Sequence, residues 1–373
     1  MNLKRIISNP LNIFLFIWAL ILITFQLKIA YFFPSYNYLQ YLYPSISILF
    51  FILGFLIIKF SIRRKIIKKV KVTFSKKRFK IFVFSLFSMV IIIILLNLKL
   101  FGMPPFFSFL GYDTYVYLEY GRFKGVLFAL LIFIYIISIY ATKKFSIFMK
   151  LFSIAILLLY VSRGNIIFSI IVYFFLLVYE NKLSNKKLFI LIHLLIIFVL
   201  ILFQILGEFR TGTNVFYASL EIKEEYQIEN SGLIWLVSYI SMPFVNFLEL
   251  TNHNNLFFGE NIISRSLPAF MSFNMESIAF YKSILPNKLN TVSGYLANVY
   301  LDFGLVGIIL YNFFLGILLS YSFYISKNKI LKSVLITCIA LLFFVDYFFY
   351  FTTILIIILS IIFNKIIFKR KKI

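Results

Sequence analysis

Residues 81–96 read IFVFSLFSMVIIIILL, a run without a single charged side chain. A helix that crosses the hydrocarbon core of a bilayer needs about 20 mostly apolar residues, and this run lies within a longer apolar stretch over 81–101. A second run, TTILIIILSIIF, covers Thr352–Phe363. Runs of this kind need a lipid solvent, so they predict a polytopic α-helical membrane protein.

The composition of the whole chain agrees with that class. Of its 373 residues, 62% are hydrophobic and 13% are charged, whereas soluble domains have roughly 45–50% apolar and about 25% charged residues. Continuous apolar runs exclude an outer-membrane barrel, whose strands alternate over about ten residues. The lone cysteine, Cys338, excludes an intramolecular disulfide. We expect an all-α fold with one integral membrane domain over 1–373.

The apolar segments predict about ten transmembrane helices. The first segment is long enough to span and lacks a small-x-small cleavage site, so we expect it to be retained rather than removed as a signal peptide. The fifth, sixth and ninth segments are short or interrupted. The expected spans are 11–30, 39–60, 81–101, 125–141, 148–162, 164–179, 188–207, 296–321, 331–346 and 350–364.

The charges predict the orientation of these spans. The chain carries 37 Lys and Arg against 13 Asp and Glu, a net charge of +24. With both termini in the cytoplasm, 27 of the 37 basic residues fall on the cytoplasmic side, whereas Glu180 is the one acidic residue there. A sided charge suits an anionic cytoplasmic leaflet. The basic run over 63–71 is therefore interpreted as an orientation signal, and no nucleic-acid partner is expected.

The longest hydrophilic stretch, 208–295, is predicted to be a large outer loop. Inside it, residues 233–250 are apolar but contain Pro243 and end near Glu249. We interpret them as a re-entrant or surface-lying helix. The alternative, a full span, would invert everything that follows and place basic segments outside, against the Lys/Arg bias.

Few arginines are expected on the outer side. Arginine is costly at membrane depth unless it is paired or lines a wet cavity, and its fork binds phosphate oxygens bidentately. Each could instead be an interfacial side chain that reaches to the headgroups. For Arg163, which is followed by Gly164 where backbone can approach a ligand, we favour a functional role. The outer arginines are Arg122, Arg163, Arg210 and Arg265.

Candidate bases lie on the same side. His253 and Glu249 could accept a proton from a sugar hydroxyl, with Glu208 and Glu260 as further candidates. Asp302, near the outer end of the eighth span, could act likewise or pair with an outer arginine as a structural contact. Asp346 is interpreted as a turn residue. Clustered His, Cys and carboxylate ligands are lacking in the sequence, so neither a metal nor a cofactor is expected.

Three stretches resemble one family, the O-antigen and capsular polysaccharide polymerases of the Wzy type. SRGN at 162–165 resembles that family's arginine after its fifth span, and EFRTG at 208–212 resembles its second arginine site. SGYLANVYLDFGLVGIILYNFFLG at 293–316 resembles the segment that re-enters the membrane after the large loop. The likeness covers about 145–320. It implies a GT-C-like membrane fold.

The resemblance also implies a reaction and its site. A glycan would pass from undecaprenyl pyrophosphate to the non-reducing end of another lipid-linked repeat unit, outside the cytoplasmic membrane. Arg163 and Arg210 would bind the pyrophosphate, with Arg265 on phosphate or glycan. His253, Glu249 or Asp302 would be the catalytic base. The remaining implied substrate-binding residues are Arg122, Tyr295 and Asn298.

The resemblance leaves rival functions open. An O-antigen ligase shares the architecture and would use a lipid A core acceptor. A lipid-linked oligosaccharide flippase would be a transporter, but flippases have about twelve spans and short loops, unlike the 208–295 stretch. For a membrane acyltransferase, the sequence offers no convincing set of acyl-transfer residues. Expected partners are the lipid-linked oligosaccharide, the lipid bilayer of the bacterial cytoplasmic membrane, and a chain-length regulator and flippase of the same pathway.

Overall fold

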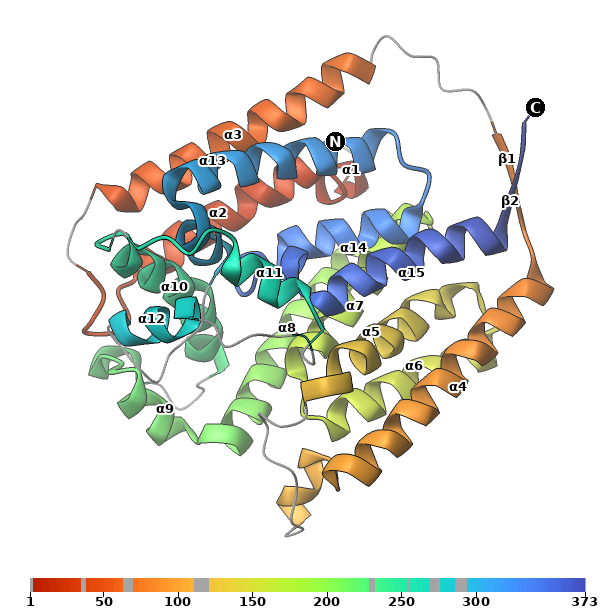
Figure 1. The fold of residues 1–373 in the computed structure, drawn as a ribbon, viewed down its shortest axis with the longest axis horizontal. Helices are drawn as coiled ribbons and strands as arrows, with labels where there is room; N and C mark the ends of the chain where they lie inside the picture. The colour runs from red at the N-terminus through yellow and green to blue at the C-terminus, as the bar shows by residue number, and fades with distance from the viewer. Residues whose placement is uncertain are drawn as a thin grey trace.

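The computed structural model describes residues 3–34, 38–62, 70–110, 121–227, 232–253, 255–268, 271, 276–285 and 294–372. The expected all-α class is confirmed: apart from one two-stranded sheet, the regular structure of these ranges is helical. Figure 1 shows the long helices lying side by side in one bundle.

The helices of the bundle are as follows. The long ones are α2 (Pro10–Gln26), α3 (Leu39–Ile62), α4 (Lys76–Phe101), α5 (Gly121–Ile137), α6 (Lys143–Leu159), α7 (Arg163–Tyr179), α8 (Asn185–Thr211), α10 (Gly232–Leu250), α13 (Tyr295–Tyr324), α14 (Lys329–Ala340) and α15 (Phe351–Ile367). The short ones are α1 (Leu3–Ile7), α9 (Thr213–Ser219), α11 (Glu260–Ser266) and α12 (Glu276–Ile284).

Six helices of the described ranges are long and apolar enough to cross a membrane. They lie at 39–61, 76–101, 123–140, 185–205, 232–250 and 295–324, and α2, α7 and α15 are shorter apolar helices of 17 residues each. The chain is thus an all-α protein built around apolar, membrane-length helices. The expected count of ten spans stays a prediction.

Helix α10 occupies the segment expected to be re-entrant or surface-lying. By length and composition it is one of the six candidates, and it is the most buried of them. Its residues contact successive helices: Trp235 packs on Gly207 of α8, and Phe244 and Phe247 meet Phe25 of α2 and Tyr43 of α3. α10 therefore packs against α2, α3 and α8, and the expectation that it re-enters the membrane or lies on its surface stays a prediction.

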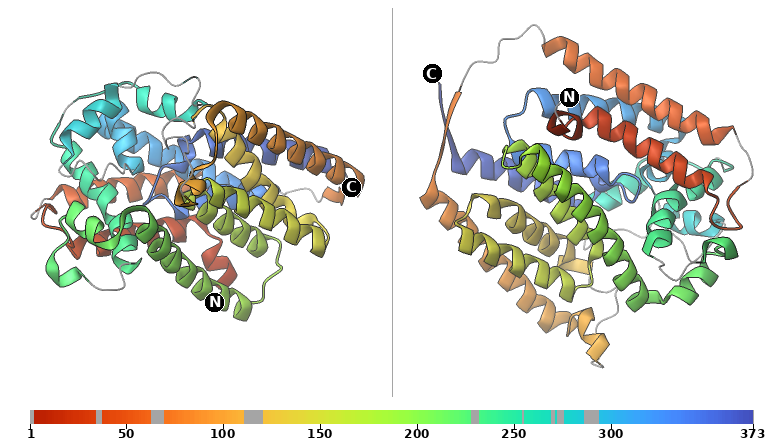
Figure 2. Two further views of the ribbon diagram at one scale, coloured as in Figure 1. Left: turned by 90° about the horizontal axis from the view of Figure 1, so that it is seen from below. Right: turned by 180° about the vertical axis from the view of Figure 1, so that it is seen from behind.

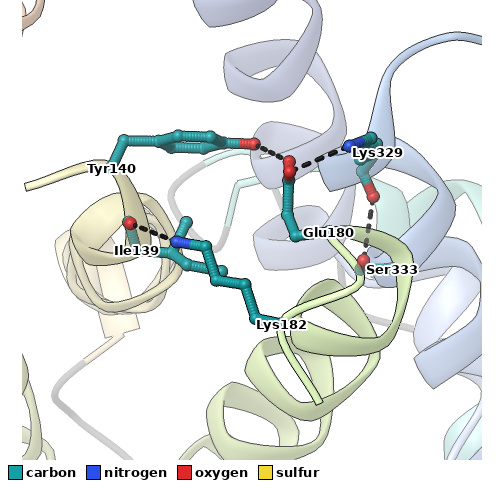
Figure 3. Close-up of polar contacts among 6 residues, drawn as sticks. All are labelled: Ile139, Tyr140, Glu180, Lys182, Lys329 and Ser333. Carbon is teal, nitrogen blue, oxygen red and sulfur yellow. Dashed lines mark hydrogen bonds and ion pairs between the residues drawn. The ribbon is translucent and has the colours of Figure 1, made fainter. Parts of the chain in front are cut away.

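Several basic segments gather at one end of the bundle, which we call the basic end. Strand β1 (Val70–Phe74) pairs antiparallel with β2 (Phe368–Lys372) (Figure 1), and Phe74 packs on Tyr140. Beside them, Glu180 accepts a hydrogen bond from the Tyr140 hydroxyl at 2.8 Å and pairs with the Lys329 ammonium at 2.8 Å (Figure 3). Segments far apart in sequence are thus tied together around one carboxylate.

The opposite end carries α9, α11 and α12 (Figure 1), and we call it the loop end. The chain after α9 is bound to the end of α2: Ala30 forms a bridge with Ile222, and the Tyr226 hydroxyl donates to the Leu27 carbonyl at 2.9 Å. Seen from behind in Figure 2, α8 runs along the molecule between the two ends. Apart from α10, the described part of 208–295 therefore consists mostly of short helices packed on this end.

The closest helix contact joins α3 and α13. A Cβ atom on Gly54 would lie 2.0 Å from the Phe313 carbonyl oxygen, and one on Gly316 would lie 2.3 Å from that of Phe51. The Ser320 hydroxyl donates to the Phe55 carbonyl at 2.8 Å. Small residues let backbones approach in a lipid solvent, where dispersion replaces the hydrophobic effect as the force between helices.

Helix α13 is broken at Gly304, whose φ is +59°. The first part, 295–303, folds back along the second, so that the rings of Tyr295 and Tyr311 lie 5.4 Å apart. The break removes the helical partners of two carbonyl groups. The Leu301 carbonyl accepts instead from the Phe257 N–H at 2.9 Å, and the Asp302 carbonyl accepts from the Phe258 N–H at 3.0 Å.

We predict that Gly54→Ala and Gly316→Ala each lower thermal stability in detergent. The new methyl group would overlap a backbone carbonyl, which cannot rotate away, and overpacking costs typically about 1–3 kcal/mol. Differential scanning fluorimetry measures the shift. Leu53→Ile, on the exposed neighbour of Gly54, is the control. An unchanged Tm for both glycine variants would show that α3 and α13 are not closely packed.

We also predict that the two ends face opposite sides of the membrane. In a Cys338→Ala background, a membrane-impermeant maleimide added to intact cells should label Leu256→Cys at the loop end and spare Lys187→Cys at the basic end. Both positions are exposed, so lysed cells should show both labelled. The reverse pattern would mean that the basic end faces outward and that the orientation predicted from the Lys/Arg bias is wrong.

Candidate functional site

Arg163 begins α7 at the loop end, directly after the turn that closes α6. Its guanidinium donates a hydrogen bond to the Tyr239 hydroxyl and lies over three aromatic rings, 4.9 Å from Tyr239, 5.5 Å from Phe203 and 5.9 Å from Trp235. Cation–π contacts of this kind are favourable and directional. The positive end of the α7 dipole adds to the same potential, so an anion is attracted here.

The aromatic residues around Arg163 are themselves fixed. Trp235 stacks on Phe216 with centroids 3.6 Å apart, and Gly207 lets it approach α8, since a Cβ there would lie 2.7 Å from the indole. Tyr239 packs on Phe344 at 5.2 Å. Arg163 is therefore held by α8, α10 and the 341–350 connection between α14 and α15, rather than extended along the surface.

A second polar group forms where α11 docks on the first part of α13. The Asp302 carboxylate accepts from the backbone N–H groups of Asn261 at 3.0 Å and Ile262 at 2.8 Å. The Asn261 amide donates to the backbone and side-chain oxygens of Asn298, at 3.2 and 3.3 Å. Asp302, Asn298 and Asn261 are all buried. Asp302 thus anchors the start of α11, which favours the structural alternative for it.

Arg265 is fixed by this second group. Its Nε donates to the Asn261 side-chain oxygen at 2.9 Å. It interacts electrostatically with Asp302 and with Asp346. Burial raises the pKa of Tyr281, while the nearby Arg265 and a hydrogen bond with Asn246 act in the opposite direction. The sequence predicted Arg265, Asp302 and Asn298; Asn261, which joins them, was missed, although it precedes Arg265 by one helical turn.

Tyr295 lies deeper, below this group. Its hydroxyl donates to the Asn312 side chain at 3.3 Å. Next to it, the Tyr311 hydroxyl donates to Asp346 at 3.1 Å, and the Phe348 N–H donates to the same carboxylate oxygen at 3.1 Å. Asp346 is a turn residue, as expected, but it is also fully buried. Sequence reasoning missed that burial because the turn folds under α11.

The 341–350 connection lies between the two arginines. On one side, Gly164, which follows Arg163, lies against it: a Cβ there would be 3.3 Å from the Tyr347 hydroxyl. On the other, the hydroxyl of Ser266, which follows Arg265, donates to the Phe349 carbonyl at 3.3 Å. The helices that carry the two arginines therefore both pack against one shared segment.

The remaining predicted residues stand in different positions. His253 follows α10, is half-buried, and packs edge-on against Phe280 of α12 at 5.8 Å. Glu249 lies in the last turn of α10 and is half-buried. Both stay candidates for proton transfer. The side chains of Arg122 and Arg210 lie outside the described part of the chain. Glu208 accepts a hydrogen bond from the Thr213 hydroxyl.

Among the described residues, no three His, Cys, Asp or Glu side chains come together in a way that could hold a metal ion. Comparison of the chain with protein-family models, with curated proteins and with solved structures finds no match.

The contacts of Asp302 lead to a prediction. Asp302→Asn should speed hydrogen exchange at the Asn261 and Ile262 amides and lower the free energy of unfolding by about 1–3 kcal/mol, because one backbone N–H would lose its acceptor. Mass-spectrometric exchange in detergent measures the first effect. Glu276→Gln, on an exposed residue of α12, is the matched carboxylate-to-amide control. Unchanged exchange in α11 would contradict the docking contact.

Proposed function

We propose that the chain is a glycosyltransferase that polymerises lipid-linked oligosaccharide repeat units at the outer face of the bacterial cytoplasmic membrane. The donor is a glycan on undecaprenyl pyrophosphate, and the acceptor is the non-reducing end of another lipid-linked unit. The observation that carries the proposal is the pair Arg163 and Arg265, each fixed at the loop end on one side of the 341–350 connection. The resemblance to Wzy-type polymerases supports it.

The membrane topology of the proposal follows the charges. The basic end faces the cytoplasm with both termini, and about ten segments cross or enter the bilayer. The loop end, with 208–295, then meets the headgroups of the outer leaflet. A lipid pyrophosphate would lie at that level, which is where Arg163 and Arg265 are held.

The two arginines suit the leaving group of this reaction. As the bond between the anomeric carbon and the pyrophosphate oxygen breaks, the electron pair leaves with the pyrophosphate, and negative charge grows on its oxygens. A guanidinium group stays charged, and each one can bind two such oxygens at once. Because aromatic rings and Asn261 already orient them, they stabilise that charge with little reorganisation.

The acceptor needs a base. Its hydroxyl oxygen attacks the anomeric carbon and its proton passes to His253 or Glu249, both half-buried at the end of α10. Asp302 is a weaker candidate because both its oxygens already accept backbone N–H groups. Tyr295 and Asn298 are tied into the buried network, and we assign them the support of this site rather than direct glycan contact.

The test is a gel of surface polysaccharide from a deletion strain complemented with wild-type or variant protein at matched membrane expression. Wild type should restore a ladder. Arg163→Ala should reduce polymer by about 100-fold or more, the range found when a preorganised donor is removed from a charged transition state. Arg163→Lys should recover a small part, because the charge stays and the fork is lost.

Arg5→Ala is the control, since Arg5 is an exposed arginine of α1 that the proposal leaves without a role. Single repeat units in the deletion strain indicate a polymerase. Long polymer that accumulates unattached on its lipid carrier would indicate a ligase, and lipid-linked single units trapped on the cytoplasmic face would indicate a flippase. A normal ladder with Arg163→Ala would refute its role in the reaction.

A further inference from the structure

The break in α13 is accompanied by a left-handed backbone conformation at a phenylalanine, Phe258. Phe258 has a φ of +46°, because its N–H must reach the Asp302 carbonyl that the break at Gly304 leaves open. This left-handed region favours glycine, and a non-glycine residue there carries strain. Glycine or asparagine at this position would make the same backbone hydrogen bond with less conformational strain.

The side chain of Phe258 gains nothing inside the protein. At 79% exposure it is the most exposed large apolar side chain of the described residues. Strain and exposure together mean that the folded chain is less stable with phenylalanine here than it could be. Strain at an exposed side chain therefore points to a ligand or a second molecule that supplies the missing contact.

Phe258 is part of a continuous apolar surface around the break, which we call the kink patch. Gly259 lies within contact of Phe303 and Ile263, since a Cβ there would be 3.4 Å and 3.6 Å from them. A Cβ on Gly304 would lie 3.5 Å from Leu256. The kink patch consists of Leu256, Phe258, Ile263, Phe303 and Val306, all of them exposed.

The kink patch continues along α13 toward the basic end. Val306, Leu310 and Phe314 are exposed and four residues apart, so they lie on one face of the helix. The same face carries Leu318, which is also exposed. A narrow apolar stripe therefore runs from the loop end along the outer surface of α13, a helix long enough to cross the membrane.

The upper end of this stripe adjoins a charged site. Helix α11 turns Ile263 outward to the kink patch, while Asn261 and Ser264 are buried and Arg265 is bound to Asn261 on the inner side. One short helix thus lies between the Arg265 guanidinium, to which the proposed function assigns a phosphate contact, and an apolar surface. The matching ligand has a phosphate group at the level of α11 and a long hydrocarbon chain that descends from it.

We infer that the kink patch and the stripe below it bind the polyprenyl chain of the lipid-linked substrate and so orient its phosphates toward Arg265. This inference rests on the proposed function. The chain is already dissolved in lipid, so its binding gains dispersion contacts with aromatic and branched side chains rather than hydrophobic transfer. The exposed ring of Phe258, fixed by its strained backbone, supplies such a contact beside the headgroups.

The test is photo-crosslinking of purified protein in proteoliposomes with a polyprenyl phosphate that carries a diazirine along its chain. Labelled peptides should come from 255–266 and 303–318, and excess unlabelled polyprenyl pyrophosphate should suppress that labelling. Phe258→Gly should reduce it by about threefold to tenfold, the equivalent of one aromatic contact. Its Tm should be equal to or higher than that of wild type, because glycine relieves the backbone strain.

Phe84→Ser is the matched control, because Phe84 is a similarly exposed phenylalanine, at 75%, on the outer face of α4. It should leave the labelling of 255–266 and 303–318 unchanged. Labelling of α4 and α13 to the same extent, without competition by polyprenyl pyrophosphate, would make the kink patch an ordinary lipid contact and overturn the inference.

Failure of the inference and failure of the proposed function give different results. A ladder restored by wild type, with the polyprenyl label on other segments, would overturn the inference alone. Competed labelling of the kink patch in a protein whose deletion leaves the polysaccharide ladder intact would support the lipid site and refute the polymerase.

Discussion

Inside a membrane, each backbone N–H and C=O group must find a partner within the protein, because lipid offers none. The break of α13 at Gly304 meets this requirement through the chain at 257–258, whose N–H groups bind the carbonyls of Leu301 and Asp302. Much of the loop end depends on that exchange. It fixes where 257–258 lies, and the Asp302 side chain then fixes the start of α11. Arg265 is carried one turn further along α11, beside the 341–350 connection.

The two ends of the bundle use charge in different ways. At the basic end, Glu180 joins α7 to α14 and to the residues after α5, in a contact that tolerates water because Lys329 is partly exposed. At the loop end, the two arginines whose side chains the structure describes are each fixed by neighbouring side chains. Arg163 is held by rings and a tyrosine hydroxyl, and Arg265 by an asparagine. A fixed cation surrounded by apolar groups acts on a ligand more strongly than one in water does, which suits the phosphate contact proposed for these arginines.

The acidic residues and the histidine of the loop end fall into a supporting group and a candidate reactive group. Asp302 and Asp346 lie inside the protein, and each accepts hydrogen bonds from backbone N–H groups. Glu249 and His253 lie nearer the surface. Burial of a charged group is costly unless hydrogen bonds compensate it. Because the inner pair receives these bonds from α11 and the 341–350 connection, it holds both segments in place. The outer pair has the access to solvent that the proposed proton transfer requires.

The sequence by itself determined the all-α class and the apolar helices, because long runs such as Ile81–Leu96 have no stable place outside lipid or a large core. It also predicted several residues that the structure brings together, Arg265, Asp302 and Asn298, since polar side chains are rare near apolar segments and each is conspicuous. The placement of Arg163 against Tyr239 was not predictable, because it depends on the packing of α10 against α8 and the 341–350 connection. The reversal of α13 at Gly304 was equally hidden, because the sequence there has a continuous helical pattern. The hydrogen bonds that compensate the break come from 257–258, which only the tertiary structure brings there.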